Sequence, residues 1–170
     1  MHRISLLASV TAGLVGAVVL TSLQSPAAAH CEIPCGIYDD NARIRQLLED
    51  TDTIAKAVAQ IQSLAAASDA LSINQLTRWV NNKEEHATKI QETIAQYFLN
   101  QRVKPAPKGS AGWEDYVERL TRHHAVMVAA MTTKQTVDPA KVDELRATIN
   151  AIAGYYPPAA PAAPATPTKR

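Results

Sequence analysis

The chain has few of the residue types that mark common classes of protein. Cysteine occurs twice, glycine six times and phenylalanine once in 170 residues. The few glycines form no phosphate-binding loop, and no segment is repeated. A net charge of only +1 gives no electrostatic footprint for nucleic acid or for an anionic membrane surface. Because aromatic residues are scarce and alanine is abundant, the composition favours helices over sheet.

Residues 1–29 have the organisation of an export signal. Arg3 supplies a positive start, the run from Ile4 to Leu20 carries no charge, and Ala27 to Ala29 match a signal-peptidase site. We expect cleavage after Ala29 and export to a periplasm or to the medium, with no membrane attachment afterwards. The alternative is an uncleaved anchor, because the apolar run approaches the length that spans a bilayer.

Four later segments place apolar residues at helical spacing. We expect helices over 40–67, from 72 to about 98, over 113–133 and over 138–154. The short connections 68–71 and 134–137 favour antiparallel neighbours, whereas 103–112 has the prolines and glycines of a mobile loop. The sequence therefore predicts an all-α, up-down antiparallel four-helix bundle over 40–156. The tail over 157–170, almost entirely Pro, Ala and Thr, is expected to be disordered.

Local signals predict where these helices begin. Asp40 is the expected N-cap of the first helix, Ser72 and Gln75 form a capping box for the second, and Asp138 caps the fourth with Pro139 in its first position. The apolar stripes predict the side chains that face the core: Ile44, Leu47, Thr51, Ile54, Val58, Ile61 and Ala65; Leu76, Trp79, Val80, Ile90, Ile94, Tyr97 and Phe98; Trp113, Val117, Leu120, His124, Met127 and Met131; Val142, Leu145, Ile149 and Ile152.

Several of these residues have ordinary structural explanations. Met127 and Met131 are expected to fill the core and not to bind metal. His123 and His124 are expected to be satisfied core or surface residues and not ligands. Glu84 and Glu85 are typical of a solvated helix face.

The segment His30-Cys31-Glu32-Ile33-Pro34-Cys35-Gly36-Ile37-Tyr38 directly follows the expected cleavage point. After cleavage, the amine of His30 and the amide nitrogen and thiolate of Cys31 form two fused chelate rings. Cys35 can return a second thiolate across a turn in which Pro34 fixes its own φ and Gly36 permits an unusual one. This hook, residues 30–39, offers a planar set of two nitrogens and two sulfurs, and the imidazole of His30 remains for an axial position.

Planar coordination of this kind favours Ni(II) or Cu(II) over zinc, which prefers a tetrahedron. Because thiolates tend to reduce Cu(II), nickel is the better assignment. An ionised amide and two thiolates are strong donors that stabilise Ni(III), so a Ni(II)/Ni(III) cycle becomes accessible. Such a site can pass single electrons to and from a small molecule.

Two alternatives use the same residues without turnover. The chain could be an exported nickel or copper carrier that binds metal for trafficking. It could also be a structural helical protein with a Cys31–Cys35 disulfide, although so small a loop would stabilise the fold only slightly.

The pattern His30-Cys31-x-x-Pro34-Cys35-Gly36-x-Tyr38 resembles the N-terminal hook of the nickel superoxide dismutase family, and the resemblance extends over about His30 to Tyr156. It implies one nickel ion per subunit, superoxide as substrate, oxygen and hydrogen peroxide as products, and a homohexamer. His30 would supply its amine and the axial imidazole, and Cys31 and Cys35 the remaining ligands. Tyr38 would stand over the open face, order water and limit access; with His30 it is the expected catalytic residue.

The resemblance also implies groups that orient the axial imidazole, an Arg and a Glu in the family. The Arg position falls on His86, and the Glu position falls near Arg45 or Gln46, where this chain has no carboxylate. The candidates for this role here are Glu49, Arg78 and His86. Tyr97 corresponds to a second pocket tyrosine, on a helix about one turn shorter than in the family.

Overall fold

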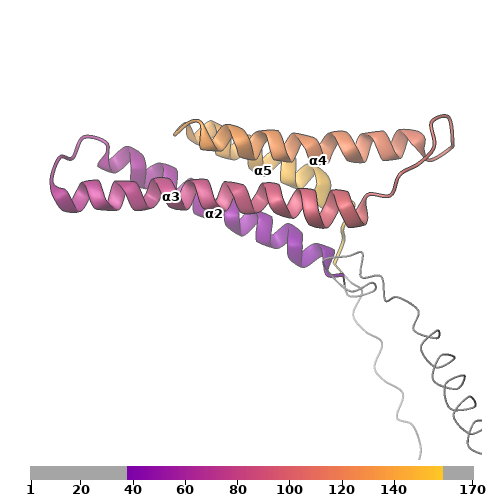
Figure 1. Ribbon diagram of the computed structural model, residues 1–170, viewed down its shortest axis with the longest axis horizontal. Coiled ribbons are helices and arrows are strands. Elements are labelled where there is room, and N and C mark those ends of the chain that lie inside the picture. The colour runs from indigo at the N-terminus through magenta and orange to yellow at the C-terminus, as the bar shows by residue number, and fades with distance from the viewer. Residues whose placement is uncertain (1–37, 159–170) are drawn as a thin grey trace, which may run out of the picture. The chain divides into compact units, whose positions relative to one another are not determined.

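A computed structural model describes residues 38–158, which form a bundle of helices (Figure 1). The elements are α2 (Asp40–Leu64), α3 (Ala70–Glu92), its π-helical continuation η1 (Thr93–Arg102), α4 (Trp113–Lys134) and α5 (Pro139–Ala153). Each of the four helices packs against the next one along the chain, and α5 packs against α2 to close the bundle. The predicted all-α four-helix bundle is confirmed, and residues 38–158 contain no strand.

Two predicted N-caps are wrong, by one and by three residues. Asp39, not Asp40, caps α2, because its backbone is non-helical and its carboxylate accepts the N–H of Ala42 at 2.8 Å. Helix α3 begins at Ala70, since Asp69 accepts the N–H groups of Leu71 and Ser72. The capping box at Ser72 is therefore not formed.

The start of α5 agrees with its prediction. The carboxylate of Asp138 accepts the N–H of Ala140 at 3.0 Å, and Pro139 occupies the first turn. No helix in the part of the chain that the structure describes is long and apolar enough to cross a membrane.

Most of the predicted core is buried, including all four positions of α5. The exceptions on the first two helices are Ala65 and Val80, which are exposed, and Leu76 and Trp79, which are half-buried. On α4 the predicted stripe is one residue out of register: His123 and Val126 are buried, whereas His124 and Met131 are exposed. A polar side chain can occupy the inner position because both ring nitrogens of His123 find partners, described below.

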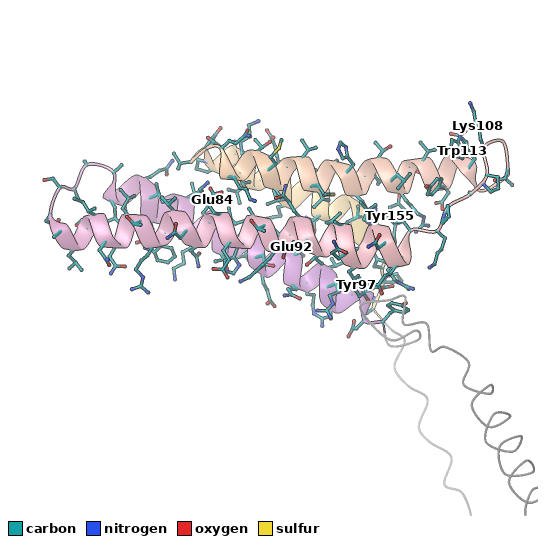
Figure 2. All side chains as sticks on the ribbon, viewed as in Figure 1. Glu84, Glu92, Tyr97, Lys108, Trp113 and Tyr155 are labelled. Atoms are coloured by element: carbon teal, nitrogen blue, oxygen red, sulfur yellow. The ribbon has the colours of Figure 1, made fainter. Side chains whose placement is uncertain are left out.

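Three parts of the chain meet at one end of the bundle. The start of α2 lies beside the end of η1, where Tyr97 is located (Figure 2), and Arg102 of η1 binds Asp40 of α2. The segment after α5 arrives at the same end, since Asn41 donates to the carbonyl of Tyr156 at 3.2 Å. Because Tyr38 directly precedes α2, this is the end of the bundle to which the hook is joined.

The predicted signal peptide (1–29), most of the hook and the tail beyond residue 158 lie outside the described residues. The loop predicted over 103–112 does connect η1 to α4, and it contains a turn closed by the N–H of Ser110 on the carbonyl of Pro107. Gly109 in this turn has φ of +83°, a conformation that favours glycine.

Candidate metal centre and its supporting cluster

The predicted nickel ligands His30, Cys31 and Cys35, and the turn residues Pro34 and Gly36, lie outside the described residues. Within residues 38–158, no group of three or more His, Cys, Asp or Glu side chains could hold a metal ion. That part of the bundle therefore offers no competing centre. The donor set of the hook, by its residue types, suits nickel.

Tyr38, the first described residue, packs on the edge of the core between two side chains of η1. The ring of Tyr97 meets it edge to face, with centroids 6.1 Å apart and an interplanar angle of 74°. The guanidinium of Arg102 lies over the Tyr38 ring, 4.3 Å from its centroid. The two tyrosines that sequence analysis proposed for the pocket are thus brought together.

Asp40 ties these groups to the start of α2. Nε of Arg102 donates to Oδ1 and Oδ2 at 2.8 and 3.1 Å, and Nη2 donates to Oδ2 at 2.6 Å. The hydroxyl of Tyr97 donates to Oδ1 at 2.8 Å. We call Tyr38, Asp40, Tyr97 and Arg102 the Asp40 cluster.

The electrostatics of the Asp40 cluster fix its protonation states. Burial raises the pKa of the Tyr97 hydroxyl, and its hydrogen bond to the Asp40 carboxylate raises it further. The hydrogen bond to Asp40 likewise raises the pKa of Arg102. Tyr97 is therefore a neutral donor and Arg102 a cation at neutral pH, and the carboxylate between them receives donors on both oxygens.

Asp40 and Arg102 were not anticipated as partners from the sequence. They are 62 positions apart, and Asp40 had been assigned to the helix cap. One signal was available: the adjacent aspartates Asp39 and Asp40 stand at the start of α2, and only one of them is needed as its cap.

The proposed partners of the axial imidazole do not lie together. Nδ1 of His86 contacts Oδ1 of Asp50 at 2.5 Å, so the partner of His86 is neither Glu49 nor Arg78. Glu49 is exposed, and Arg78 is exposed near the start of α3, beside Gln75.

Asp50, which sequence analysis did not point to, is a buried carboxylate with one oxygen unpaired within residues 38–158. It is 6% exposed, and its Oδ2 has no hydrogen-bond partner among the residues that the structure describes. The signal in the sequence is its place on the inward stripe of α2, between Leu47 and Ile54. A carboxylate at such a position predicts a polar partner on a facing helix.

His123 is a core residue, as expected. Its Nδ1 lies 2.7 Å from the carbonyl of Arg119, and its Nε2 lies 2.9 Å from the hydroxyl of Tyr156. Because a carbonyl only accepts, Nδ1 carries the proton and Nε2 accepts from Tyr156. Burial lowers the pKa of His123, so the neutral ring is favoured.

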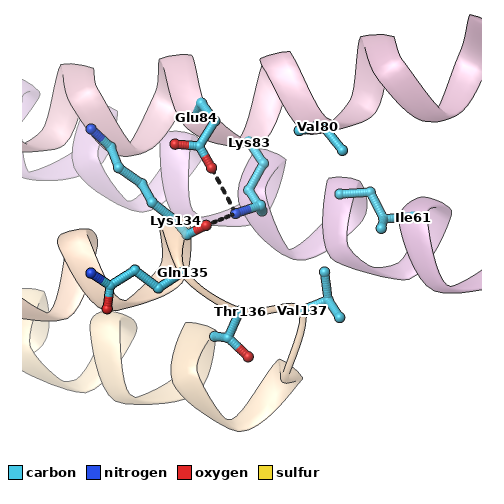
Figure 3. Close-up of a pocket in the computed structure, with 8 residues that line it drawn as sticks. All are labelled: Ile61, Val80, Lys83, Glu84, Lys134, Gln135, Thr136 and Val137. Carbon is cyan, nitrogen blue, oxygen red and sulfur yellow. Dashed lines mark hydrogen bonds and ion pairs between the residues drawn. The ribbon is translucent and has the colours of Figure 1, made fainter.

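An open pocket of about 450 Å³ lies between α3 and the α4–α5 connection (Figure 3). The buried Lys83 borders it and donates through Nζ to the carbonyls of Thr133 and Lys134 at 2.7 and 2.6 Å. The same Nζ contacts Oε1 of Glu84 at 2.9 Å, so Glu84 is ion-paired and not simply solvated. These contacts close the last turn of α4, and the arrangement is a helix cap supplied by a neighbouring helix.

Comparison with known proteins identifies the family. The family model described as nickel-containing superoxide dismutase matches residues 25–159, which include the hook and all the described helices. No curated protein and no solved structure matches the chain. Since the matched segment is far more than half of the chain, the chain belongs to the family of nickel-containing superoxide dismutases, enzymes that convert superoxide to oxygen and hydrogen peroxide through a Ni(II)/Ni(III) cycle.

Proposed function

We propose that this chain performs superoxide dismutation at its N-terminal hook, with His30, Cys31 and Cys35 as the nickel ligands. The observation that carries this assignment is the family match, which covers the hook. The described bundle supports it, because residues 38–158 contain no other cluster able to hold a metal. The carrier alternative is not favoured, since the matching family is one of enzymes.

When bound, nickel supplies the one-electron couple by which one superoxide is oxidised to oxygen and a second is reduced, with two protons, to hydrogen peroxide. The chain's own contribution begins with Tyr38, which stands at the junction of hook and bundle. Its phenol would order water beside the hook and limit access to molecules of the size of superoxide. Tyr97 supports it from η1 through the edge-to-face ring contact.

Processing and assembly belong to the same proposal. Removal of residues 1–29 creates the amine of His30, so export and formation of the first ligand are one event. One nickel ion is bound per subunit, and the subunits assemble as a homohexamer. Exposed apolar side chains on α4, Val128 and Met131, support association between copies.

His86, paired with Asp50, supports the hook from the bundle. It takes the role for which Glu49 and Arg78 were the other candidates. The pairing of His86 with a buried carboxylate is what favours it over the other two candidates. The unpartnered Oδ2 of Asp50 leaves one acceptor for a donor outside the described residues.

The test is metal analysis combined with N-terminal sequencing of protein purified from its native host. We expect an N-terminus at His30, one equivalent of nickel per chain and catalytic removal of superoxide. Nickel without turnover would support the carrier instead. A stable Cys31–Cys35 disulfide without nickel, or an N-terminus elsewhere, would contradict the assignment of the hook.

A further inference from the structure

The guanidinium of Arg102 makes two different kinds of contact at once. Its edge is hydrogen-bonded to the carboxylate of Asp40, and its face covers the ring of Tyr38 at 4.3 Å. We propose that Arg102 is a positioning residue for Tyr38, holding the phenol in place at the hook through a guanidinium plane fixed by Asp40. This inference rests on the proposed role of Tyr38 at the nickel site.

The first step is the fixed plane of the guanidinium. Nε and Nη2 both reach Asp40, whose side chain is only 16% exposed. A planar group held along one edge by a carboxylate cannot turn freely, so the direction of its faces is set. A lysine ammonium carries the same charge but has no plane and no second donor in a fixed fork.

The second step is that Asp40 controls both contacts of the Tyr38 ring. The Tyr97 hydroxyl donates to Oδ1 of the same carboxylate, and the Tyr97 ring meets Tyr38 edge to face. Tyr97 is itself buried, 4% exposed, and packs against Phe98. One carboxylate at the start of α2 thus fixes the groups on two sides of Tyr38.

The third step is the π-helical geometry of η1. In an α-helix, residues five apart point about 140° away from each other, whereas the wider turn of a π-helix, with its i→i+5 hydrogen bonds, brings them closer to one face. Tyr97 and Arg102 are five apart, and the adjacent N–H of Val103 bonds to the carbonyl of Phe98 at 2.9 Å. The π-helix therefore brings both side chains to Asp40.

Attraction of superoxide by charge is a different role, and the local charges argue against it. Arg102 is ion-paired with Asp40, and the Asp40 cluster holds no further charged side chain. The cluster has no net charge to steer an anion. Position, not charge, is the property that Arg102 supplies.

The experiment uses the processed protein carrying Arg102→Met or Arg102→Lys, with ¹³C-labelled tyrosine. Because the chain has five tyrosines, each ring signal can be assigned by a Tyr→Phe variant. Arg119→Met is the matched control: its guanidinium lies 4.2 Å over Tyr155 and is paired with Asp115. The spectra of the tyrosine rings are recorded without nickel. Superoxide removal, and its dependence on ionic strength, are measured with nickel bound.

We expect both Arg102 variants to shift the Tyr38 signals without nickel and to leave those of Tyr155 in place, while Arg119→Met does the reverse. The two Arg102 variants should bind as much nickel as the wild type but remove superoxide roughly ten- to a hundredfold more slowly. This is the usual effect of losing a group that orients a metal site. Unchanged Tyr38 signals in Arg102→Met, or full rescue by Arg102→Lys, would overturn the proposal. A wild-type protein that binds nickel without turnover would instead contradict the proposed function, and the ring spectra would still test Arg102.

Discussion

At the residue scale, the bundle places a few polar side chains where each has a defined set of partners. Asp40 receives donors from Tyr97 and Arg102, and His123 uses both ring nitrogens in the core. Such groups stabilise the fold while they are fully paired, and removal of one partner leaves another polar atom without a hydrogen bond. These are the sites where single substitutions should have the largest effects.

The first prediction concerns Asp40→Asn. The substitution removes the negative charge between Arg102 and the Tyr97 hydroxyl, so the free energy of unfolding should fall by about 1–3 kcal/mol. Urea unfolding followed by circular dichroism measures it. Asp52→Asn is the control, because Asp52 is ion-paired with Arg146 but is mostly exposed; equal losses in the two variants would show that the pairing of Asp40 is not special.

The second prediction concerns acid. The unfolded chain binds a proton at histidine near pH 6.5, whereas burial lowers the pKa of His123 in the folded chain. Below about pH 6.5 the unfolded state therefore takes up the proton first, and stability should fall as the pH decreases. Urea midpoints across this range should decline less steeply in His123→Gln, while His124→Gln, at an exposed position, should follow the wild type. Identical slopes in all three proteins would exclude His123 as the source.

At the element scale, the four helices follow from the sequence, but the register of α4 and the π-helical geometry of η1 do not. The stripe on α5 predicted Val142, Leu145, Ile149 and Ile152 correctly, because an apolar face at helical spacing must be buried. On α4 the apolar spacing fits two adjacent registers. In the observed register His123 is buried and bonds to Tyr156, 33 positions away, and spacing within the helix does not reveal this pairing. The π-helix has no signal in composition or periodicity, so the pairing of Tyr97 with Arg102 on Asp40 could not be predicted.

The third prediction tests the register of η1. Inserting one Ala after the exposed Asn100 places Tyr97 and Arg102 six apart, a spacing that in an α-helix turns them about 120° from each other, so Arg102 should turn away from Asp40. We expect the tyrosine ring signals of the Asp40 cluster to change and superoxide removal to slow, with the helical content nearly unchanged. Asn100→Ala keeps the residue count and should behave as the wild type. An insertion variant with wild-type ring signals would show that the register of η1 is not needed for the cluster.

The fourth prediction tests the cap that α3 supplies to α4. Lys83→Met leaves the carbonyls of Thr133 and Lys134 without their shared donor, and the free energy of unfolding should fall by roughly 1–3 kcal/mol. Lys89→Met, which removes a lysine from an exposed pair with Glu85, is the control and should have little effect. Differential scanning calorimetry distinguishes them, and a Lys83 variant as stable as the control would contradict the role of this cap.

At the scale of the whole molecule, chemistry and fold are divided along the chain. The hook carries the proposed donor atoms, and its residue types and spacing could be recognised from the sequence because metal chemistry depends on them locally. The groups proposed to support the hook come from α2, α3 and η1, and their pairing depends on packing between distant segments. That is why His86 was found as a candidate without its partner Asp50.

The central claim is that removal of the signal peptide creates the first nickel ligand, and a single added residue tests it most directly. A processed protein carrying one extra Ala before His30 keeps every side chain of the hook but moves the free amine away from it. We predict that this variant loses nickel binding in the hook and catalytic removal of superoxide, while its circular dichroism spectrum remains that of the bundle. An extended protein that binds nickel and removes superoxide at the rate of the unextended one would contradict the account.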